Sequence, residues 1–380
     1  MKSQKINNIR LLIGPPADPA DIRYLSGFSA VDPVLLLDVA GRKTLVVRDL
    51  ELGRAKKEAR VTRVVTVTSL VKRAGGSLFE AAVALLRAER IRRVSVSRWF
   101  PARGVEVLHS SGIRVDVQEG PIVPEREWKS PREIACLMRA QRIAAYAMRT
   151  AIDQIRAAEI GPGGDLRMGR RRLYAEDLHE VVESAALRRG GLCIETIVAG
   201  GRQAANPHER GSGPLRAGEA IVLDIFPRDR ATGYWGDLTR TVVRGRPSEQ
   251  LLRMYTAVQK AQQAAIACVR AGAECAAPHR AACDIFVAMG FRTRMDARRM
   301  EGFIHSTGHG LGLEIHEAPS LADRPGRLCI GHVVTVEPGL YYPDIGGVRI
   351  EDVVCVTRRG AIRFPAPPRQ LLLDADKRRA

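Results

Sequence analysis

Hydrophobic and polar positions alternate in short blocks over the first third of the chain. The segment PVLLLDVAGRKTLVV, residues 33–47, predicts two apolar strands around a glycine turn. The segment SLFEAAVALLRAERI, residues 77–91, opens with Ser77 and Glu80 at the spacing of a capping box and therefore predicts a helix. RRVSVS, residues 92–97, then alternates at the strand period. These blocks predict an α/β fold for the N-terminal part of the chain.

The pattern changes to a long helical repeat near residue 128. Ser130 can cap a helix, Pro131 suits the first helical position, and Glu133 can reach back to the Ser130 amide. Apolar residues then recur at helical spacing across residues 134–155. We therefore place a domain boundary just before this helix.

The two predicted domains are residues 1–127 and residues 128–380. The second domain contains long helical periods, as in residues 249–272, beside two strand-like segments. These are VVTVEPGLYY and GVRIEDVVCVT, residues 333–342 and 347–357. The second domain is therefore expected to combine helices and strands.

The composition is that of a globular protein. The chain has 380 residues, of which 45% are hydrophobic and 27% charged. No apolar run approaches the roughly 20 residues that a membrane helix requires, and Leu11–Ile13 is too short for the core of a signal peptide. The seven cysteines form no C-x-x-C pair, which argues against a disulfide framework and a thiolate zinc site. We expect a cytoplasmic protein that does not contact a membrane.

Positive charge exceeds negative charge by 18, from 60 Lys and Arg against 42 Asp and Glu. Such an excess raises the possibility of nucleic-acid binding, which requires clustered cations and stacking aromatics. The cations are instead dispersed, and their short clusters at Arg170–Arg172, Arg298–Arg299 and Lys377–Arg379 contain no aromatic residue. We expect a solvated basic surface and no nucleic-acid partner.

Four carboxylates lie beside apolar strand-like residues. Asp224 and Asp237 belong to two such segments that a turn can join into a hairpin, which would bring the carboxylates together. Glu337 and Glu351 have similar surroundings. A buried carboxylate costs several kcal/mol unless a cation compensates it. Each acid alone could pair with an arginine or face water, but four together indicate a shared site.

Three histidines occur within IHSTGHGLGLEIHEAP, residues 304–319, with glycines between or beside them: His305, His309 and His316. The four carboxylates and His309 can hold two divalent cations, because four negative charges balance four positive charges and hard oxygen ligands dominate. Cations held in this way polarise a carbonyl group and activate water. That chemistry is amide hydrolysis.

These residues carry a family resemblance. Five of them follow one characteristic order: Asp224, Asp237, His309, Glu337 and Glu351. With GYWGDLTRT, GHGLGLEIHEAP, EPGLYYPDIGGVRIED and an upstream NPH, this order resembles the pita-bread metallopeptidases, over most of residues 128–380. YLSGF and SPREI resemble the N-terminal region of creatinase, prolidase and aminopeptidase P. The resemblance implies an α+β pita-bread catalytic domain that follows a creatinase-type α/β N-terminal domain.

The resemblance also implies a role for each residue of the metal site. Asp224 would chelate one cation, His309 and Glu337 would hold the other, and Asp237 and Glu351 would bridge the two. Glu337 would in addition handle the proton of the attacking water. Manganese is the expected metal, with cobalt, zinc or iron as alternatives.

Four further residues would contact the substrate. By the same resemblance, His316 and His208 would face the substrate and its tetrahedral centre, and Arg349 would support a bridging carboxylate or the substrate. His305 matches another histidine typical of the proline-directed members. Glycines nearby let the backbone pass close to the metals.

The expected activity is hydrolysis of the bond between an N-terminal residue and proline, in peptides with proline at the second position. Both a dipeptidase and an aminopeptidase fit, and IGGVRIED favours the dipeptidase slightly. The alternatives are a pita-bread enzyme for a non-peptide substrate and a catalytically silent peptide-binding protein. The resemblance also implies a homodimer. The family usually has a glycine two residues after its first metal aspartate. Here Asp224 is followed by Ile225, Phe226 and Pro227, which indicates an altered pocket shape.

Overall fold

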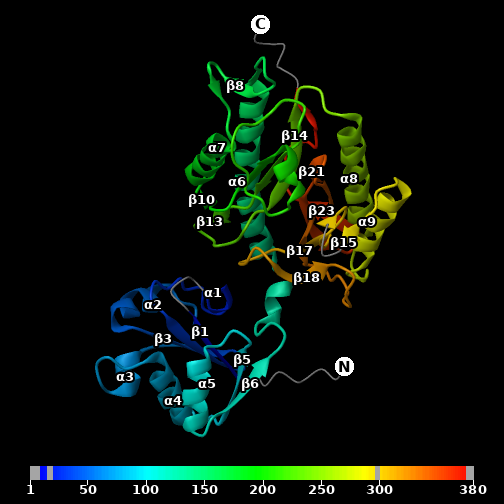
Figure 1. Ribbon diagram of the computed structural model, residues 1–380. Coiled ribbons are helices and arrows are strands. Elements are labelled where there is room, and N and C mark those ends of the chain that lie inside the picture. Colours follow the sequence, from blue (N-terminus) through cyan, green and yellow to red (C-terminus); the bar gives the residue numbers. More distant parts are fainter. Residues whose placement is uncertain (1–8, 15–19, 296–299, 374–380) are drawn as a thin grey trace. The chain divides into compact units, whose positions relative to one another are not determined.

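The architecture is described from a computed structural model (Figure 1). It describes residues 9–14, 20–295 and 300–373. The basic clusters Arg298–Arg299 and Lys377–Arg379 lie outside these residues. The chain divides into two compact units, residues 1–126 and residues 127–380, which we call the N-terminal and the C-terminal unit.

The N-terminal unit is built on one six-stranded sheet in the order β4-β3-β2-β1-β5-β6. Strand β2 is antiparallel to both of its neighbours, and the other pairs are parallel. The strands are β1 Ile9–Gly14, β2 Val34–Val39, β3 Arg42–Val47, β4 Arg63–Thr66, β5 Arg93–Ser97 and β6 Arg114–Gln118. The helices are α1 Ala20–Ser26, η1 Asp49–Glu51, α2 Leu52–Glu58, α3 Val67–Val71, α4 Leu78–Ala88, α5 Ala102–Ser110 and η2 Pro124–Glu127, the last reaching the start of the C-terminal unit.

Both faces of this sheet are buried, as its unbroken apolar runs require. Leu35 and Leu37 pack in the core that contains α4, whereas Leu36 packs in the core that contains α1. Ser77 and Glu80 form the capping box of α4. The expected strands, helix and α/β class are therefore confirmed for this unit.

The C-terminal unit has two main sheets, each covered by its own pair of helices. Helices α6 and α7 lie on one flank and α8 and α9 on the other, with strands between them (Figure 1). The four-stranded sheet β11-β12-β14-β24 packs with α6 and α7, and the five-stranded sheet β18-β17-β19-β22-β23 packs with α8 and α9. The helices are α6 Pro131–Ala157, α7 Ala175–Arg188, η3 Gly201–Ala205, α8 Glu249–Cys268 and α9 Ala277–Ala288.

The strands of this unit include several short ribbons. The main-sheet strands are β11 Ile197–Gly200, β12 Ile221–Ile225, β14 Leu238–Arg244, β17 Gly308–Gly310, β18 Glu317–Leu321, β19 Val333–Val336, β22 Asp352–Thr357, β23 Gly360–Arg363 and β24 Leu372–Leu373. The ribbons are β7 Glu159–Ile160, β8 Leu166–Met168, β9 Arg171–Arg172, β10 Gly191–Leu192, β13 Arg228–Asp229, β15 Arg294–Met295, β16 Met300–Glu301, β20 Gly339–Tyr342 and β21 Gly346–Arg349.

Two expected strands of the C-terminal unit are each interrupted. Residues 333–342 form β19 and β20 with a break at Glu337. Residues 347–357 lie in β21 and β22, with a break at Glu351. At the second break the Glu351 N–H donates to Thr239 O, 3.1 Å away, instead of continuing the ladder. Both glutamates therefore lie just beyond the end of a strand. Their side chains need not follow the alternation between the two faces of a sheet.

The helix beginning at Ser130 is present as α6, with the expected capping box and Pro131 in its first turn.

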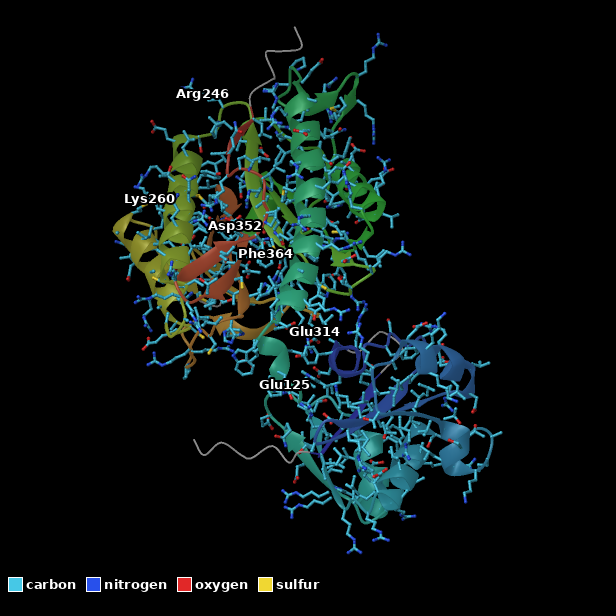
Figure 2. The ribbon with its side chains drawn as sticks, turned by 180° about the vertical axis from the view of Figure 1, so that it is seen from behind. Glu125, Arg246, Lys260, Glu314, Asp352 and Phe364 are labelled. Atoms are coloured by element: carbon cyan, nitrogen blue, oxygen red, sulfur yellow. The ribbon has the colours of Figure 1, made fainter. Side chains whose placement is uncertain are left out.

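Charged side chains cover the outside of the unit: Arg246 and Lys260 point outward, whereas Asp352 and Phe364 lie between the helices and strands (Figure 2). Within the described part of the chain, every helix is too short or too polar to cross a bilayer.

Candidate metal centre

Strand register places Asp224 and Asp237 on one face of a sheet. β12 and β14 run antiparallel, with Asp224 opposite Thr239. Residues two apart on a strand face the same side, so Asp237, just before β14, shares the face of Thr239 and Asp224. The expected hairpin-like pairing of the two aspartate segments is present.

A buried glutamine of α6 holds the backbone of Asp237. The Asp237 N–H donates to Gln141 Oε1 and the Gln141 side-chain amide donates to Asp237 O, both at 2.9 Å. Gly236 allows this close approach, because a Cβ there would lie 2.6 Å from Ala140 O. The position of Asp237 is therefore set by a helix remote from it in sequence.

His309 projects from β17 toward two of the acids. Its Nε2 lies 3.2 Å from Glu337 Oε1 and 3.6 Å from Asp237 Oδ2. The Nδ1–H can donate to Gly310 O at 3.0 Å. That hydrogen bond favours the tautomer in which Nε2 presents a lone pair to a cation.

Glu351 completes the cluster from the opposite strand. β19 and β22 pair Val336 with Asp352, so Glu337 and Glu351 occupy the next positions beyond this pair. The Thr239 hydroxyl donates to Glu351 Oε2 at 2.9 Å. Possible ligand atoms of Asp237, His309 and Glu351 lie within 4.8 Å of one another.

The electrostatics of these acids fit a cation. Burial, together with the charges of neighbouring carboxylates, raises the pKa of Asp237 and of Glu351 well above the usual range. Asp224 Oδ1 and Glu351 Oε1 are both buried and have no hydrogen-bond partner in the described part of the chain. Buried carboxylates that repel one another and leave oxygens unpaired are compensated when cations bind. The donor set, oxygen-rich with one imidazole, fits divalent metals.

His309 and Glu337 form a strongly coupled pair. Burial lowers the pKa of His309, but the hydrogen bond and charge of Glu337 outweigh it and raise the pKa to about 9. Burial likewise opposes ionisation of Glu337, yet the bond to His309 lowers the pKa of Glu337 to about 2. Thr335 also donates to Glu337 Oε1, at 3.1 Å. Glu337 is thus held ionised.

Arg349 links the site to a chain of polar groups. The guanidinium is 3% exposed and donates to Asp224 Oδ2 at 2.7 Å and to Tyr341 Oη at 2.8 Å. Tyr341 Oη in turn lies 2.9 Å from His305 Nε2, and His305 Nδ1 lies 2.7 Å from Ser306 O. Burial lowers the pKa of His305 to about 4. His305 is therefore a neutral acceptor for the tyrosine hydroxyl.

The other two expected histidines are exposed and lie beside this cluster. The His316 ring packs edge-on against His309, with ring centroids 4.3 Å apart and planes at 88°. Burial and the charge of His309 lower the pKa of His316. His208 is near enough that its charge also lowers the pKa of His305 and His316. The structure thus brings all nine expected residues into one region.

Sequence reasoning did not single out Gln141 or Tyr341. Gln141 had a detectable signal, because it is a polar residue on the apolar face of α6 between Leu137 and Ala144. Tyr341 had none, because it is one of two adjacent tyrosines in a strand. Its contacts with Arg349 and His305 and its complete burial distinguish it from the partly exposed Tyr342.

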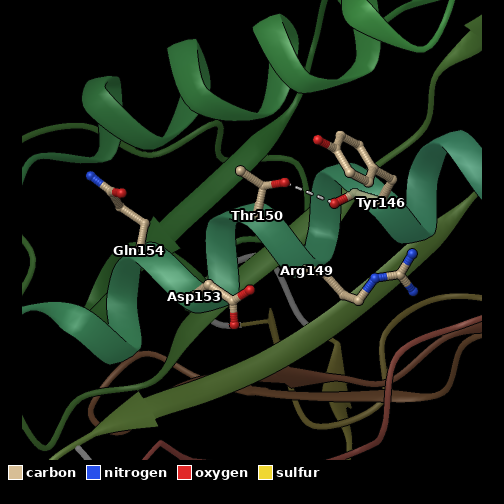
Figure 3. Close-up of a pocket in the computed structure, with 5 residues that line it drawn as sticks. All are labelled: Tyr146, Arg149, Thr150, Asp153 and Gln154. Carbon is tan, nitrogen blue, oxygen red and sulfur yellow. Dashed lines mark hydrogen bonds between the residues drawn. The ribbon is translucent and has the colours of Figure 1, made fainter. Parts of the chain in front are cut away.

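A separate pocket of about 440 Å³ opens beside α6 (Figure 3). It is lined by Tyr146, Arg149, Thr150, Asp153 and Gln154. Its lining contains one carboxylate and no histidine. This lining does not match the ligand chemistry of the metal centre.

Two stretches of the chain match known families. Residues 135–358 match Metallopeptidase family M24, and residues 16–110 match the Creatinase/Prolidase N-terminal domain. The expected pita-bread catalytic domain and creatinase-type N-terminal domain are thus confirmed.

Similar proteins align over nearly the whole chain. An uncharacterized peptidase of Bacillus subtilis, YqhT, is 29% identical over 98% of this chain and 100% of its own length. A Xaa-Pro dipeptidase of Pyrococcus furiosus is 28% identical over 94% of each chain. The solved structure of a Xaa-Pro dipeptidase from Bacillus anthracis superposes with a TM-score of 0.81 at 26% identity, over 96% of this chain and 95% of the other.

Proposed function

Because the chain belongs to metallopeptidase family M24, we propose that it hydrolyses the peptide bond between an N-terminal residue and proline, as a Xaa-Pro dipeptidase. The observation that carries this proposal is the cluster of Asp237, His309 and Glu351, flanked by Asp224 and Glu337. The names of the relatives from Pyrococcus furiosus and Bacillus anthracis support the choice of substrate.

We propose that the five residues of the metal centre hold two divalent cations, with manganese as the native metal. Asp224 would chelate one, His309 and Glu337 the other, and Asp237 and Glu351 would bridge them. When bound, such cations polarise the scissile carbonyl and make water a better nucleophile. The unpaired oxygens of Asp224 and Glu351 support this assignment, because each has capacity for a further ligand.

The protein's own groups would then handle the proton and the substrate. Glu337 would take the proton of the attacking water and deliver it to the leaving proline nitrogen. His316 and His208 would donate hydrogen bonds to the substrate and its developing oxyanion, because both are exposed. His316 packs against His309, and His208 follows Pro207, whose carbonyl oxygen accepts from Arg349 at 3.4 Å. Arg349 and His305 would orient Asp224 and Tyr341.

Three finer expectations are proposals. We propose that the two domains are residues 1–127 and 128–380, that the protein is cytoplasmic, and that it is a homodimer. Light scattering at micromolar concentration tests the dimer, and a purely monomeric protein would contradict it.

The activity is tested by mass-spectrometric product analysis after incubation of manganese-loaded protein with Ala-Pro, Ala-Pro-Ala, Ala-Ala and a longer peptide beginning Ala-Pro. Cleavage of Ala-Pro alone is the expected result. Cleavage of the longer proline peptides would indicate an aminopeptidase instead. If none is cut with manganese, cobalt, zinc or iron, peptide hydrolysis is wrong and a non-peptide substrate becomes the leading alternative.

Two variants make this test specific. Glu337→Ala is expected to abolish turnover while circular dichroism shows an unchanged fold, because the proton acceptor and one ligand are lost. Asp153→Asn removes a carboxylate of α6 that lines the pocket of Figure 3 and does not belong to the metal centre, so this variant should remain fully active. Activity in Glu337→Ala would refute the metal-site assignment.

A further inference from the structure

A buried ion pair joins the loop that carries His316 to the segment just before α6. Lys129 Nζ is 2.8 Å from Glu317 Oε2, and the two side chains are only 1% and 6% exposed. Burying two such charges costs several kcal/mol per ion, which good geometry and further hydrogen bonds must offset. Neither partner is in the metal cluster, so the pair needs a separate explanation.

Glu317 closes the loop from residue 312 to residue 317. Its Oε1 accepts a hydrogen bond from the Glu314 N–H at 3.0 Å. Its carboxylate also packs on Gly312, where a Cβ would lie 2.3–2.5 Å from the carboxylate atoms. The loop therefore folds around the Glu317 carboxylate.

Lys129 approaches from a different and well-anchored segment. Its backbone N–H donates to Gly331 O at 2.9 Å, and the next residue, Ser130, caps α6. Both ends of the ion pair are thus fixed, one on the start of a long helix and the other on the loop. The ammonium restrains the loop against this helix.

The first half of the loop has its own restraint. The Trp235 N–H donates to Gly312 O at 2.9 Å, and the indole N–H donates to Leu313 O at 3.0 Å. The second half contains His316, which is directly bonded in sequence to Glu317 and packs edge-on against His309. The position of His316 therefore depends on where Glu317 is held.

We propose that Lys129 is a positioning residue for His316. Its buried ion pair with Glu317 holds the second half of the loop, so that the His316 ring stays against His309 and faces the substrate. This inference rests on the proposed peptidase function for the role of His316, but not for the restraint of the loop.

The kinetic test is a double-mutant cycle on Ala-Pro hydrolysis. Lys129→Met keeps most of the length of the side chain and removes its charge. It is expected to lower kcat/KM about 10- to 100-fold, as loss of an orienting partner typically does. In a His316→Ala background the same change is expected to cost less than about twofold, because the residue on which Lys129 acts is gone. Equal losses in both backgrounds would overturn the proposal, because a general loss of fold acts on both.

A second readout does not depend on activity. Amide hydrogen exchange followed by mass spectrometry should be faster in Lys129→Met for peptides covering residues 311–317, with other regions of the C-terminal unit unchanged. Unchanged exchange in this loop, or a general increase, would overturn the proposal. If wild type cuts no peptide, the proposed function fails, and this comparison still decides whether Lys129 restrains the loop.

Two further variants complete the design. If Lys129→Met does not fold, Glu317→Gln replaces it, because the amide oxygen can still accept from Glu314 while the carboxylate charge is lost. The matched control is Arg10→Met, which breaks the partly buried pair of Arg10 with Asp38 (2.6 Å) in the N-terminal unit. It should lower stability while leaving kcat/KM and exchange of the loop unchanged.

Discussion

Arg349 Nη2 lies 2.7 Å from Asp224 Oδ2, so one oxygen of this carboxylate is held by a guanidinium. The other oxygen, Oδ1, is buried and has no hydrogen-bond partner among the described residues. A carboxylate held in this way is oriented before a cation binds, which lowers the entropy cost of binding. The same guanidinium donates to Tyr341, so it also connects Asp224 to His305.

Arg349→Lys should therefore weaken the site although the charge is kept, because an ammonium cannot reproduce the planar fork that reaches Asp224 and Tyr341. We expect about a 10- to 100-fold loss of manganese affinity or of kcat/KM. Isothermal titration calorimetry and steady-state kinetics measure the two quantities. Arg246→Lys, at an exposed arginine of the same unit (Figure 2), is the matched control, and equal losses in both variants would contradict the role of Arg349.

Gln141→Leu should destabilise the protein. The substitution leaves the buried N–H and C=O of Asp237 without the side-chain partners at 2.9 Å, at about 1–3 kcal/mol for each unsatisfied group. Denaturant unfolding measures the loss. Gln154→Leu, on the same helix but lining the pocket of Figure 3, should change stability by less than about 0.5 kcal/mol. Similar losses of unfolding free energy in the two variants would mean that the contacts of Gln141 do not stabilise the protein.

Divalent metal should raise the thermal stability of the protein. The buried acids repel one another, and a cation that binds only the folded state stabilises it by about 2.7 kcal/mol when present at about 100 times its Kd. Thermal unfolding is compared in chelator and in manganese, and the midpoint should rise with metal concentration. Asp237→Asn should reduce this rise, since it removes a proposed bridging ligand. A midpoint that ignores manganese, cobalt, zinc and iron alike would contradict a metal centre.

His332 should make the protein less stable in mild acid. The residue is 2% exposed, its Nδ1 accepts from the Cys329 N–H at 3.2 Å, and its Nε2 is buried without a hydrogen-bond partner among the described residues. Burial, with a smaller effect of Lys129, lowers its pKa from 6.5 to about 4. The unfolded chain thus takes up a proton at a higher pH than the folded protein. The contribution of neutral His332 to the free energy of unfolding is therefore complete above pH 6.5 and is lost as the pH falls toward 4.

The measurement is denaturant unfolding of wild type and His332→Gln at several pH values. Between about pH 7 and about pH 5, wild type should lose about 1–2 kcal/mol more free energy of unfolding than the variant. Parallel pH profiles would show that His332 is not responsible.

The interrupted strands at Glu337 and Glu351 show where pattern alone was insufficient. The apolar runs on both sides of each glutamate predicted one continuous strand, because alternation does not reveal where a ladder stops. In the structure Glu351 bonds through its N–H to Thr239, on a different strand, and the ladder resumes at Asp352. The break depends on a partner that is distant in sequence.

The sequence by itself determined the elements and the ligand chemistry. The capping boxes of α4 and α6 and the apolar strands follow from residue type and local spacing, so they could be predicted without coordinates. The four carboxylates and His309 were proposed as ligands from their residue types and from the resemblance to a metallopeptidase family.

Only the tertiary structure decided which groups hold these ligands in place. Gln141 reaches Asp237 across 96 positions, Arg349 reaches Asp224 across 125, and Lys129 reaches Glu317 across 188. Contacts at such separations are set by strand register and by how helices pack on sheets, and neither quantity is encoded in the spacing of a local motif. The orientation of the candidate metal ligands is therefore a property of the folded chain.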